Sequence, residues 1–390
     1  LDTPQVSFYK NNSLVITLGL PSGSNGYSYF VGDTASGYSA TWECNFGQKS
    51  FVYTPPNSFV ALQQDNLPET AKGVSSLVWI KNRDASLNHS LQDSSRGSTQ
   101  MLYPDLTTQE ITVTDGVQKF LKGGFQMEDD TLINTSGNSY VSWNWVANSG
   151  TTASNNDGSI SSVVQANQTA GFSIVQYTGT GSNATVGHGL SSAPEWIIIK
   201  NISSGAQPWH VYHKSLGNTK AIFLDASSAS STSSQFWQNT TPTSSVFSIG
   251  SSGGVNGSSN DLIAYCWHSV DGFSKFGKYS ANNSADGAFV YLGFTPSVLI
   301  IKSNSVISWY IMDATRNTFN PVINGNTIDN PQAEFTNQFT IDFLSNGFKI
   351  RNSSSGSGAS TNHTSYSPYY YMAFAEHPFV GDGTSPVTAR

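Results

Sequence analysis

The sequence has 390 residues, of which only 11% are charged, and its formal net charge is −7. The negative charge and the dispersed basic residues argue against a nucleic-acid partner, and no stretch reaches the roughly 18 apolar residues of a membrane-spanning helix. Hydrophobic residues make up 37% of the chain and aromatic residues 12%, which is enough to bury a core and argues against disorder. The composition therefore favours an all-β protein of two to four domains, with a surface solvated by hydroxyl and amide groups.

The first predicted domain covers residues 1–68. Apolar and polar positions alternate there between Asn-Gly and Ser-Gly turns, which predicts consecutive antiparallel strands. Three motifs resemble the C-terminal half of a SPRY-type, concanavalin-like β-sandwich, in the version found in tail and head fibres of tailed phages: Phe8-Tyr9-Lys10-Asn11, Asn45-Phe46-Gly47-Gln48 and Tyr53-Thr54-Pro55-Pro56. The matching N-terminal strands are absent, so we expect them to precede Leu1 or to come from another chain.

An internal repeat organises the rest of the chain. Three apolar runs end at a lysine, and each predicts a buried strand: Leu77-Val78-Trp79-Ile80-Lys81, Trp196-Ile197-Ile198-Ile199-Lys200 and Val298-Leu299-Ile300-Ile301-Lys302. After each run come a second strand with a polar residue, a short third strand and a closing aromatic strand. The closing strands contain Trp143-Asn144-Trp145, Tyr265-Cys266-Trp267 and Met372-Ala373-Phe374.

The repeat period is far longer than the ~20–50 residues of a solenoid unit, so we expect each copy to be a module with its own core. The predicted boundaries are 69–149 for the first repeat, 150–280 for the second and 281–390 for the third with a C-terminal tail. The predicted fold is all-β, built of tandem antiparallel β-sandwich modules of jelly-roll or concanavalin type, with short helices or none.

The ordered set of motifs resembles a repeated β-sandwich module of unknown function that is common in structural proteins of marine tailed phages. The match is carried by Trp79-Ile80-Lys81-Asn82, Gly171-Phe172-Ser173-Ile174-Val175, Val186-Gly187-His188-Gly189-Leu190, Gly272-Phe273-Ser274-Lys275-Phe276 and Met372-Ala373-Phe374-Ala375-Glu376. This resemblance implies a protein of a virion appendage and identifies no ligand.

The best catalytic candidates are the polar residues of the second strand in each repeat, Asp93, His213 and Asp313. A glycosidase needs two carboxyl groups about 5–9 Å apart across a sugar ring. One polar residue per module on equivalent strands does not supply that pair, so we expect no enzymatic activity and no cofactor.

One acidic cluster, Glu128-Asp129-Asp130, is a weak candidate for Ca²⁺, which prefers several oxygen ligands. The cluster lacks the spaced acidic pattern with a glycine turn, so a solvated loop is the favoured interpretation.

Exposed aromatic side chains could instead stack on sugar rings, and the candidates are Trp209, Trp237 and Trp309. Core packing is the favoured alternative, because Trp side chains dominate sandwich cores. The equivalent repeat positions of Trp209 and Trp309 favour the core further.

The sequence as a whole predicts a non-enzymatic structural protein of a tailed-phage virion, a tail or head fibre that contacts host surface glycans. The expected partners are further copies of the chain in a homotrimer, other virion proteins and host cell-surface polysaccharide, with no membrane insertion and a virion or extracellular location. Two alternatives stay open: an extracellular filament subunit that polymerises by strand exchange, and a polysaccharide-degrading tailspike.

Overall fold

The computed structural model describes residues 5–10, 13–19, 74–148, 150–353 and 359–375. The chain divides into two compact units, Leu1–Thr70 and Ala71–Arg390. In the first unit, β1 (Gln5–Lys10) and β2 (Ser13–Gly19) pair as an antiparallel hairpin. The other motifs of the predicted concanavalin-like domain lie outside the described residues.

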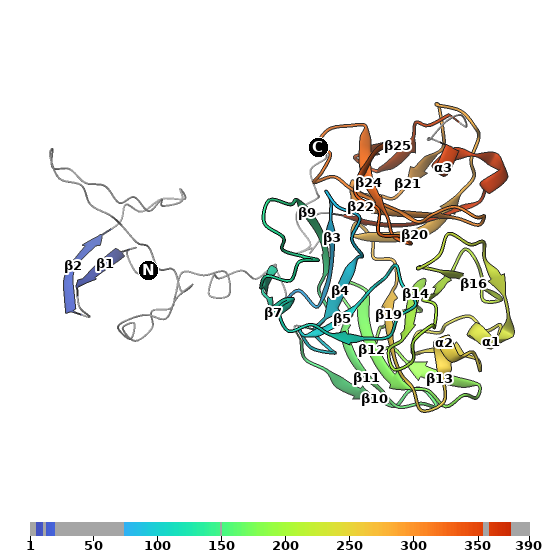
Figure 1. Cartoon of the computed structure of the whole chain (residues 1–390), viewed down its shortest axis with the longest axis horizontal. Helices are drawn as coiled ribbons and strands as arrows, with labels where there is room; N and C mark the ends of the chain where they lie inside the picture. Colours follow the sequence, from blue (N-terminus) through green and yellow to red (C-terminus); the bar gives the residue numbers. More distant parts are fainter. Residues whose placement is uncertain (1–4, 11–12, 20–73, 149, 354–358, 376–390) are drawn as a thin grey trace. The chain divides into compact units, whose positions relative to one another are not determined.

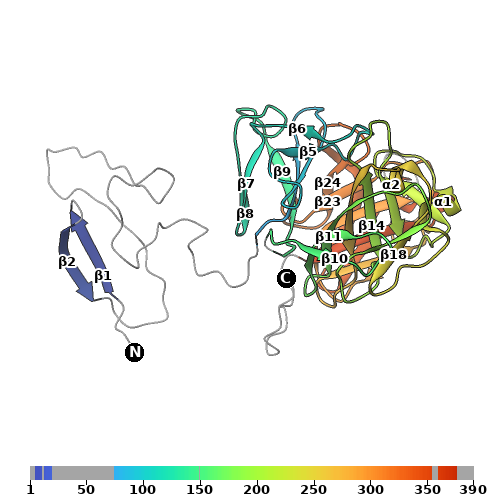
Figure 2. The ribbon, with the colours of Figure 1, turned by 90° about the horizontal axis from the view of Figure 1, so that it is seen from below.

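The first repeat forms a five-stranded antiparallel sheet in the order β6-β5-β4-β3-β9, and β7 and β8 form a separate hairpin (Figures 1 and 2). The strands are β3 (Leu77–Asn82), β4 (Ser90–Asp93), β5 (Gln100–Leu102), β6 (Ile111–Thr112), β7 (Val117–Leu121), β8 (Gly124–Met127) and β9 (Tyr140–Trp145). The apolar run of the repeat motif is β3, which lies between β4 and the aromatic strand β9.

The second repeat forms an eight-stranded sheet in the order β10-β11-β12-β19-β14-β15-β16-β17, with β13 and β18 paired separately. Its elements are β10 (Ala153–Asn155), β11 (Ser162–Asn167), β12 (Phe172–Thr178), β13 (Ala184–Gly187), β14 (Trp196–Asn201), β15 (His210–His213), β16 (Lys220–Phe223), β17 (Ser231–Thr232), α1 (Ser234–Trp237), β18 (Val246–Ile249), α2 (Gly253–Asn256) and β19 (Asp261–Trp267).

The third repeat forms an eight-stranded sheet in the order β20-β27-β22-β23-β24-β25-β26-β21. Its elements are β20 (Ser274–Tyr279), β21 (Phe289–Tyr291), β22 (Pro296–Ser303), β23 (Tyr310–Asp313), β24 (Val322–Thr327), β25 (Phe335–Leu344), β26 (Gly347–Ile350), α3 (Ala359–Asn362), η3 (Thr364–Tyr366) and β27 (Tyr369–Ala375). The sheet curls until its edge strands approach each other, and Lys275 Nζ on β20 donates to the Tyr291 carbonyl on β21 at 3.1 Å.

The prediction of an all-β fold is confirmed, and the predicted repeat strands occupy equivalent places in all three sheets. The helices of the described residues have at most four residues each. Accordingly, none of the helices in this part of the chain has the length and apolarity needed to cross a membrane.

The expectation that each repeat has a core of its own is correct for only one face of each sheet. Successive residues of a strand point to opposite faces. In β3, Val78 and Ile80 pack into a small cluster within the first repeat, whereas Leu77 and Trp79 pack into a central cluster. That central cluster takes buried side chains from all three repeats.

The same alternation holds in β14 and β22. Ile197 and Ile199 face the second repeat's own cluster while Trp196 and Ile198 face the central one. Figures 1 and 2 show the three sheets meeting around this centre rather than following one another in a row. The three repeats therefore form one compact unit, in which the cluster that each repeat has on one face is joined by a central core common to all three.

At one end of the central cluster the three closing strands meet through aromatic rings. The ring of Trp145 lies 5.9 Å from that of Trp267 and 5.5 Å from that of Phe374, in edge-to-face geometry. Trp196 stacks on Trp267 at 4.5 Å. Trp145, Trp267 and Phe374 come from the first, second and third repeats, so their ring contacts hold the repeats together.

Candidate functional site

The lysine that ends each apolar run lies at the other end of the central cluster and is fully buried. Lys81, Lys200 and Lys302 each donate to backbone carbonyls, one of which belongs to another repeat. The acceptors across the junctions are Pro331 O at 3.2 Å, Thr107 O at 2.8 Å and Ser227 O at 3.4 Å. Each lysine therefore reaches the preceding repeat in a cyclic order, and burial lowers the pKa of all three ammonium groups to about 8.

Three aspartates, one per repeat, accompany these lysines. Asp105, Asp225 and Asp329 each accept the backbone N–H of the residue that precedes the second strand, at 2.9–3.1 Å. Burial raises the pKa of all three carboxyl groups, that of Asp105 to about 7, and the nearby lysine opposes the shift in each case. The lysines and aspartates thus place three cations and three carboxyl groups together at this end of the core.

The three catalytic candidates are likewise used in contacts between repeats. Asp93 accepts a hydrogen bond from Tyr265 Oη of the second repeat at 2.7 Å, and Asp313 accepts one from Trp143 Nε1 of the first at 3.3 Å. His213 Nδ1 accepts the Ser215 N–H, so its Nε2 donates to the carbonyl oxygen of Tyr371 in the third repeat at 3.3 Å. All three side chains are buried, and the geometry gives them structural partners in place of a substrate.

Trp209, Trp237 and Trp309 are at most 2% exposed, so the structure removes them as sugar-stacking candidates. Each indole N–H donates to a backbone carbonyl, and those of Trp209 and Trp309 donate to Tyr103 O and Phe223 O of the preceding repeat. The alternative interpretation, core packing, describes all three.

His89 is the first repeat's counterpart of Trp209 and Trp309, a correspondence that the sequence analysis missed. Its Nδ1 accepts the Trp79 indole N–H at 3.0 Å, which leaves Nε2 to donate to Thr327 O of the third repeat at 2.8 Å. Burial, reinforced by Lys81, lowers the pKa of His89 to about 3 and keeps the ring neutral. The sequence signal for this correspondence was the position of His89, one residue before the second strand of its repeat. The change from a Trp to a His side chain concealed it.

The acidic cluster Glu128-Asp129-Asp130 lies in a turn after β8. The Asp130 carboxylate accepts the Leu132 N–H at 2.7 Å, and Glu128 and Asp129 are exposed. In the described part of the chain no group of three His, Cys, Asp or Glu side chains is arranged to hold a metal ion.

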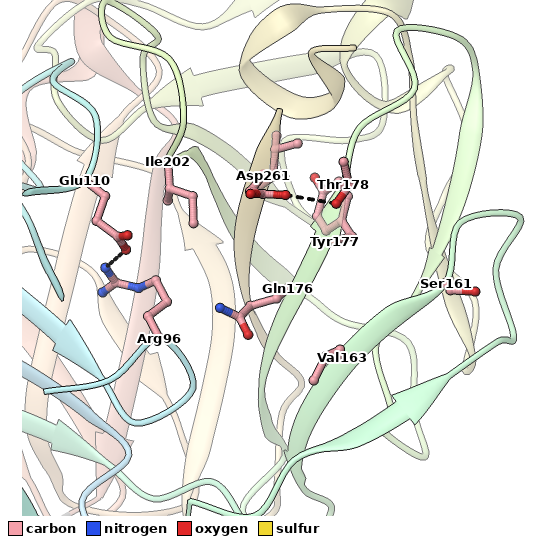
Figure 3. A pocket seen from close by; sticks show the side chains of 10 residues that line it. Arg96, Glu110, Ser161, Val163, Gln176, Tyr177, Thr178, Ile202 and Asp261 are labelled. Carbon is pink, nitrogen blue, oxygen red and sulfur yellow. Dashed lines mark hydrogen bonds and ion pairs between the residues drawn. The ribbon is translucent and has the colours of Figure 1, made fainter. Parts of the chain in front are cut away.

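One open cavity lies at the junction between the first and second repeats, with a volume of about 430 Å³. One wall carries the Arg96–Glu110 ion pair of the first repeat, joined at 2.7 Å, and the other carries Thr178 and Asp261 of the second, joined at 2.9 Å. Figure 3 shows Gln176 projecting between these two pairs, with Val163 below. Sequence analysis singled out none of these residues, because they come from strands of two different repeats and form no motif.

The Arg96 guanidinium is buried and bonded to groups of the protein itself. It is 1% exposed and pairs with Asp93 and Glu110, and it also donates to Leu91 O. Burial opposes its charge, but Asp93, Tyr265 and Glu110 more than offset the burial and raise the pKa of Arg96 above its usual value. The groups that face a ligand include carboxylate oxygens, the Gln176 amide and the hydroxyls of Ser161 and Thr178, beside the apolar Val163 and Ile202.

These polar and apolar groups suit a neutral polyhydroxylated ligand. Carboxylate and amide oxygens accept hydroxyl protons, the amide donates back, and the aliphatic side chains accept the C–H face of a ring. The cavity's volume falls within the range of about 300–1,000 Å³ typical of small-molecule sites.

A family model described as "Domain of unknown function (DUF7483)" matches residues 63–378. The match spans all three repeats, in agreement with the single compact unit that they form. No curated protein and no solved structure matches the chain.

Proposed function

This chain belongs to the DUF7483 family, whose function is unknown, and we propose that it is a non-enzymatic structural protein of a tailed-phage virion, a tail or head fibre that contacts host surface glycans. The phage assignment rests on the resemblance of the repeat motifs to virion structural proteins. The glycan contact rests on one observation, the open cavity between the first two repeats, with its hydroxyl-binding groups beside an apolar wall.

Binding is favoured over catalysis because the residues that best fitted a catalytic role are engaged elsewhere. Asp93 and Asp313 each pair with a buried arginine and accept a hydrogen bond from another repeat, and His213 bonds a backbone carbonyl. A polysaccharide-degrading tailspike would have to use other residues. Replacing Asp93, His213 and Asp313 together would disturb the contacts between repeats, so any loss of activity in that variant would reflect a loss of folding.

A glycan array probed with the purified chain tests the proposal. We expect binding to at least one host-derived polysaccharide, and a loss of at least about tenfold in affinity in Gln176→Ala and Asp261→Asn, since a lost hydrogen bond to a buried or charged partner costs roughly 1–3 kcal/mol. Gln168→Ala is the matched control, because Gln168 is exposed, donates to the Gly189 carbonyl and does not line the cavity. Failure to bind any host polysaccharide would leave a purely architectural role.

The proposed partners are further copies of the chain, expected as a homotrimer, and other proteins of the virion. Light scattering on the purified chain measures its oligomeric state directly, and a monomer at micromolar concentration would contradict the homotrimer.

A second candidate function, a filament subunit that grows by strand addition, is favoured by the edge strand β9. In the second and third repeats the strand equivalent to β9 is flanked by β12 or β20. Within the described residues β9 pairs only with β3, and it contains no charge, proline or glycine that would block a further strand. Ser142→Lys, on an exposed position of β9, should abolish concentration-dependent filaments if the chain forms them.

A further inference from the structure

Two exposed aromatic side chains lie next to each other on the outer face of β21, at the edge of the third sheet. Phe289 is 47% exposed and Tyr291 60%, while Val290 between them is buried. Residues two apart on a strand share a face and lie roughly 7 Å apart. Most of the other aromatic rings in the described residues are in the core, so this pair is a departure from the rest of the molecule.

The neighbouring strand leaves the Tyr291 ring uncovered. Gly347 of β26 is the residue opposite Tyr291 and has no side chain, and Lys349 is opposite Phe289. Lys349 is held to Asp286 at 2.7 Å, so its charge is already paired. The two rings therefore form an exposed aromatic surface, and the Lys349–Asp286 ion pair lies beside it.

A second cation lies against this surface from the other edge of the curled sheet. Lys275 Nζ lies 5.0 Å from the centroid of the Tyr291 ring and donates to the Tyr291 carbonyl at 3.1 Å. Among the residues that the structure describes, no carboxylate forms an ion pair with Lys275. Lys275 therefore places against the Tyr291 ring an ammonium group with no ion pair among the described residues, which matches a ligand that has both an apolar ring face and a negative charge.

We propose that Phe289, Tyr291 and Lys275 form a carbohydrate site for a carboxylated sugar ring, such as a hexuronate within an acidic polysaccharide. The C–H face of the sugar stacks on the aromatic rings, and its carboxylate binds the Lys275 ammonium. The inference rests on the proposed glycan-binding function and adds to it a second site, with a charge preference that the cavity at the first junction lacks.

The test is binding of the purified chain to an array of carboxylated glycans and their carboxyl-reduced, neutral counterparts. We expect the wild type to prefer the carboxylated members, and the preference to weaken as salt is raised. The double variant Phe289→Ala/Tyr291→Ala should lose at least about tenfold in affinity for them. Lys275→Met should remove the preference for the carboxylate, and Lys275→Arg should keep it.

Two controls separate this site from the rest of the molecule. Phe319→Ala removes another exposed aromatic, 86% exposed and outside the patch, and should bind as the wild type does. Gln168→Ala, an exposed position outside both the patch and the cavity, should leave the affinity for carboxylated glycans unchanged. An unchanged thermal melting temperature in each variant shows that the fold is retained.

The outcomes are distinguishable. Carboxylated-glycan binding that survives in Phe289→Ala/Tyr291→Ala overturns this site while leaving the proposed function standing. If the chain binds only neutral glycans and Gln176→Ala weakens that binding, the carboxylated-sugar site is likewise overturned and the proposed function stands. A wild type that binds no glycan overturns both, and self-association lost in the patch variant would then assign the rings to a protein interface.

Discussion

The buried lysines are the residues with the clearest dependence on pH. The pKa of Lys200 is about 8 in the folded chain, below its ordinary value of 10.5. Between these two values the unfolded chain binds a proton that the folded chain has released. The free energy of unfolding therefore gains a contribution as pH rises from about 8 to about 10, and below pH 8 the cost of burying the charged form is present in full.

Lys200→Met tests this assignment. We expect the difference in unfolding free energy between wild type and variant to shift in favour of the wild type by up to ~1 kcal/mol per pH unit between pH 8 and 10. Urea denaturation at pH 7, 8, 9 and 10 measures it, and using the difference cancels the groups common to both proteins, such as Cys266. A difference that does not vary with pH would show that Lys200 is solvated in the folded state.

The Asp93–Arg96 pair makes a second prediction at the scale of single residues. Both side chains are at most 1% exposed, so Arg96→Met leaves a buried carboxylate without its cation. We expect the free energy of unfolding to fall by about 3–5 kcal/mol.

The second repeat indicates how that loss can be recovered, since His213 and Leu216 occupy the equivalent positions without an ion pair. The double variant Asp93→Asn/Arg96→Met should regain part of the stability in a urea titration. If Arg96→Met alone unfolds at the wild-type urea concentration, the pair makes no net contribution.

At the scale of elements, the edge strand β9 should be less protected than its counterparts. Its partner among the described strands is β3 alone, whereas β19 and β27 are each flanked on both sides. Native-state hydrogen exchange should therefore show faster exchange at the outer-edge amides of β9 than at the amides of β19 or β27. Equal protection of the three strands would mean that another chain segment covers the β9 edge.

The strands themselves could be predicted from sequence because apolar runs bounded by turn residues are a local signal. What covers each face of a strand is not local. Val78 and Trp79 are adjacent and equally apolar, yet one packs within its own repeat and the other in the shared centre. The equal apolarity of both faces in β3, β14 and β22 is consistent with a core on each side, but it does not show that one of those cores is common to all three repeats.

The candidate site was less predictable for the same reason. Asp93, His213 and Asp313 were found because each repeat has a polar residue on its second strand, and Trp209 and Trp309 also share a repeat position. These recurring residues join the repeats, whereas Trp237 packs in the second repeat's own cluster. The cavity residues Glu110, Gln176 and Asp261 do not recur as a motif, and only the packing of the first repeat against the second brings them together.

At the scale of the whole molecule, the shared core should make the three repeats unfold as one cooperative unit. Leu77, Trp196 and Ile300 come from different repeats and pack in the same cluster. Lys81, Lys200 and Lys302 each donate to a carbonyl of another repeat, and so do His89, Trp209 and Trp309. Losing one repeat would expose the inner faces of the other two, so no repeat is expected to persist alone.

Hydrogen exchange of the full chain in increasing denaturant, read from peptides of β3, β14 and β22, measures this most directly. The structure predicts that the three strands, one from each repeat, lose protection at the same denaturant concentration and with the same dependence on it. If the peptides of one repeat exchange at a lower concentration while those of the other two stay protected, the repeats are separate domains and the shared core does not hold them together.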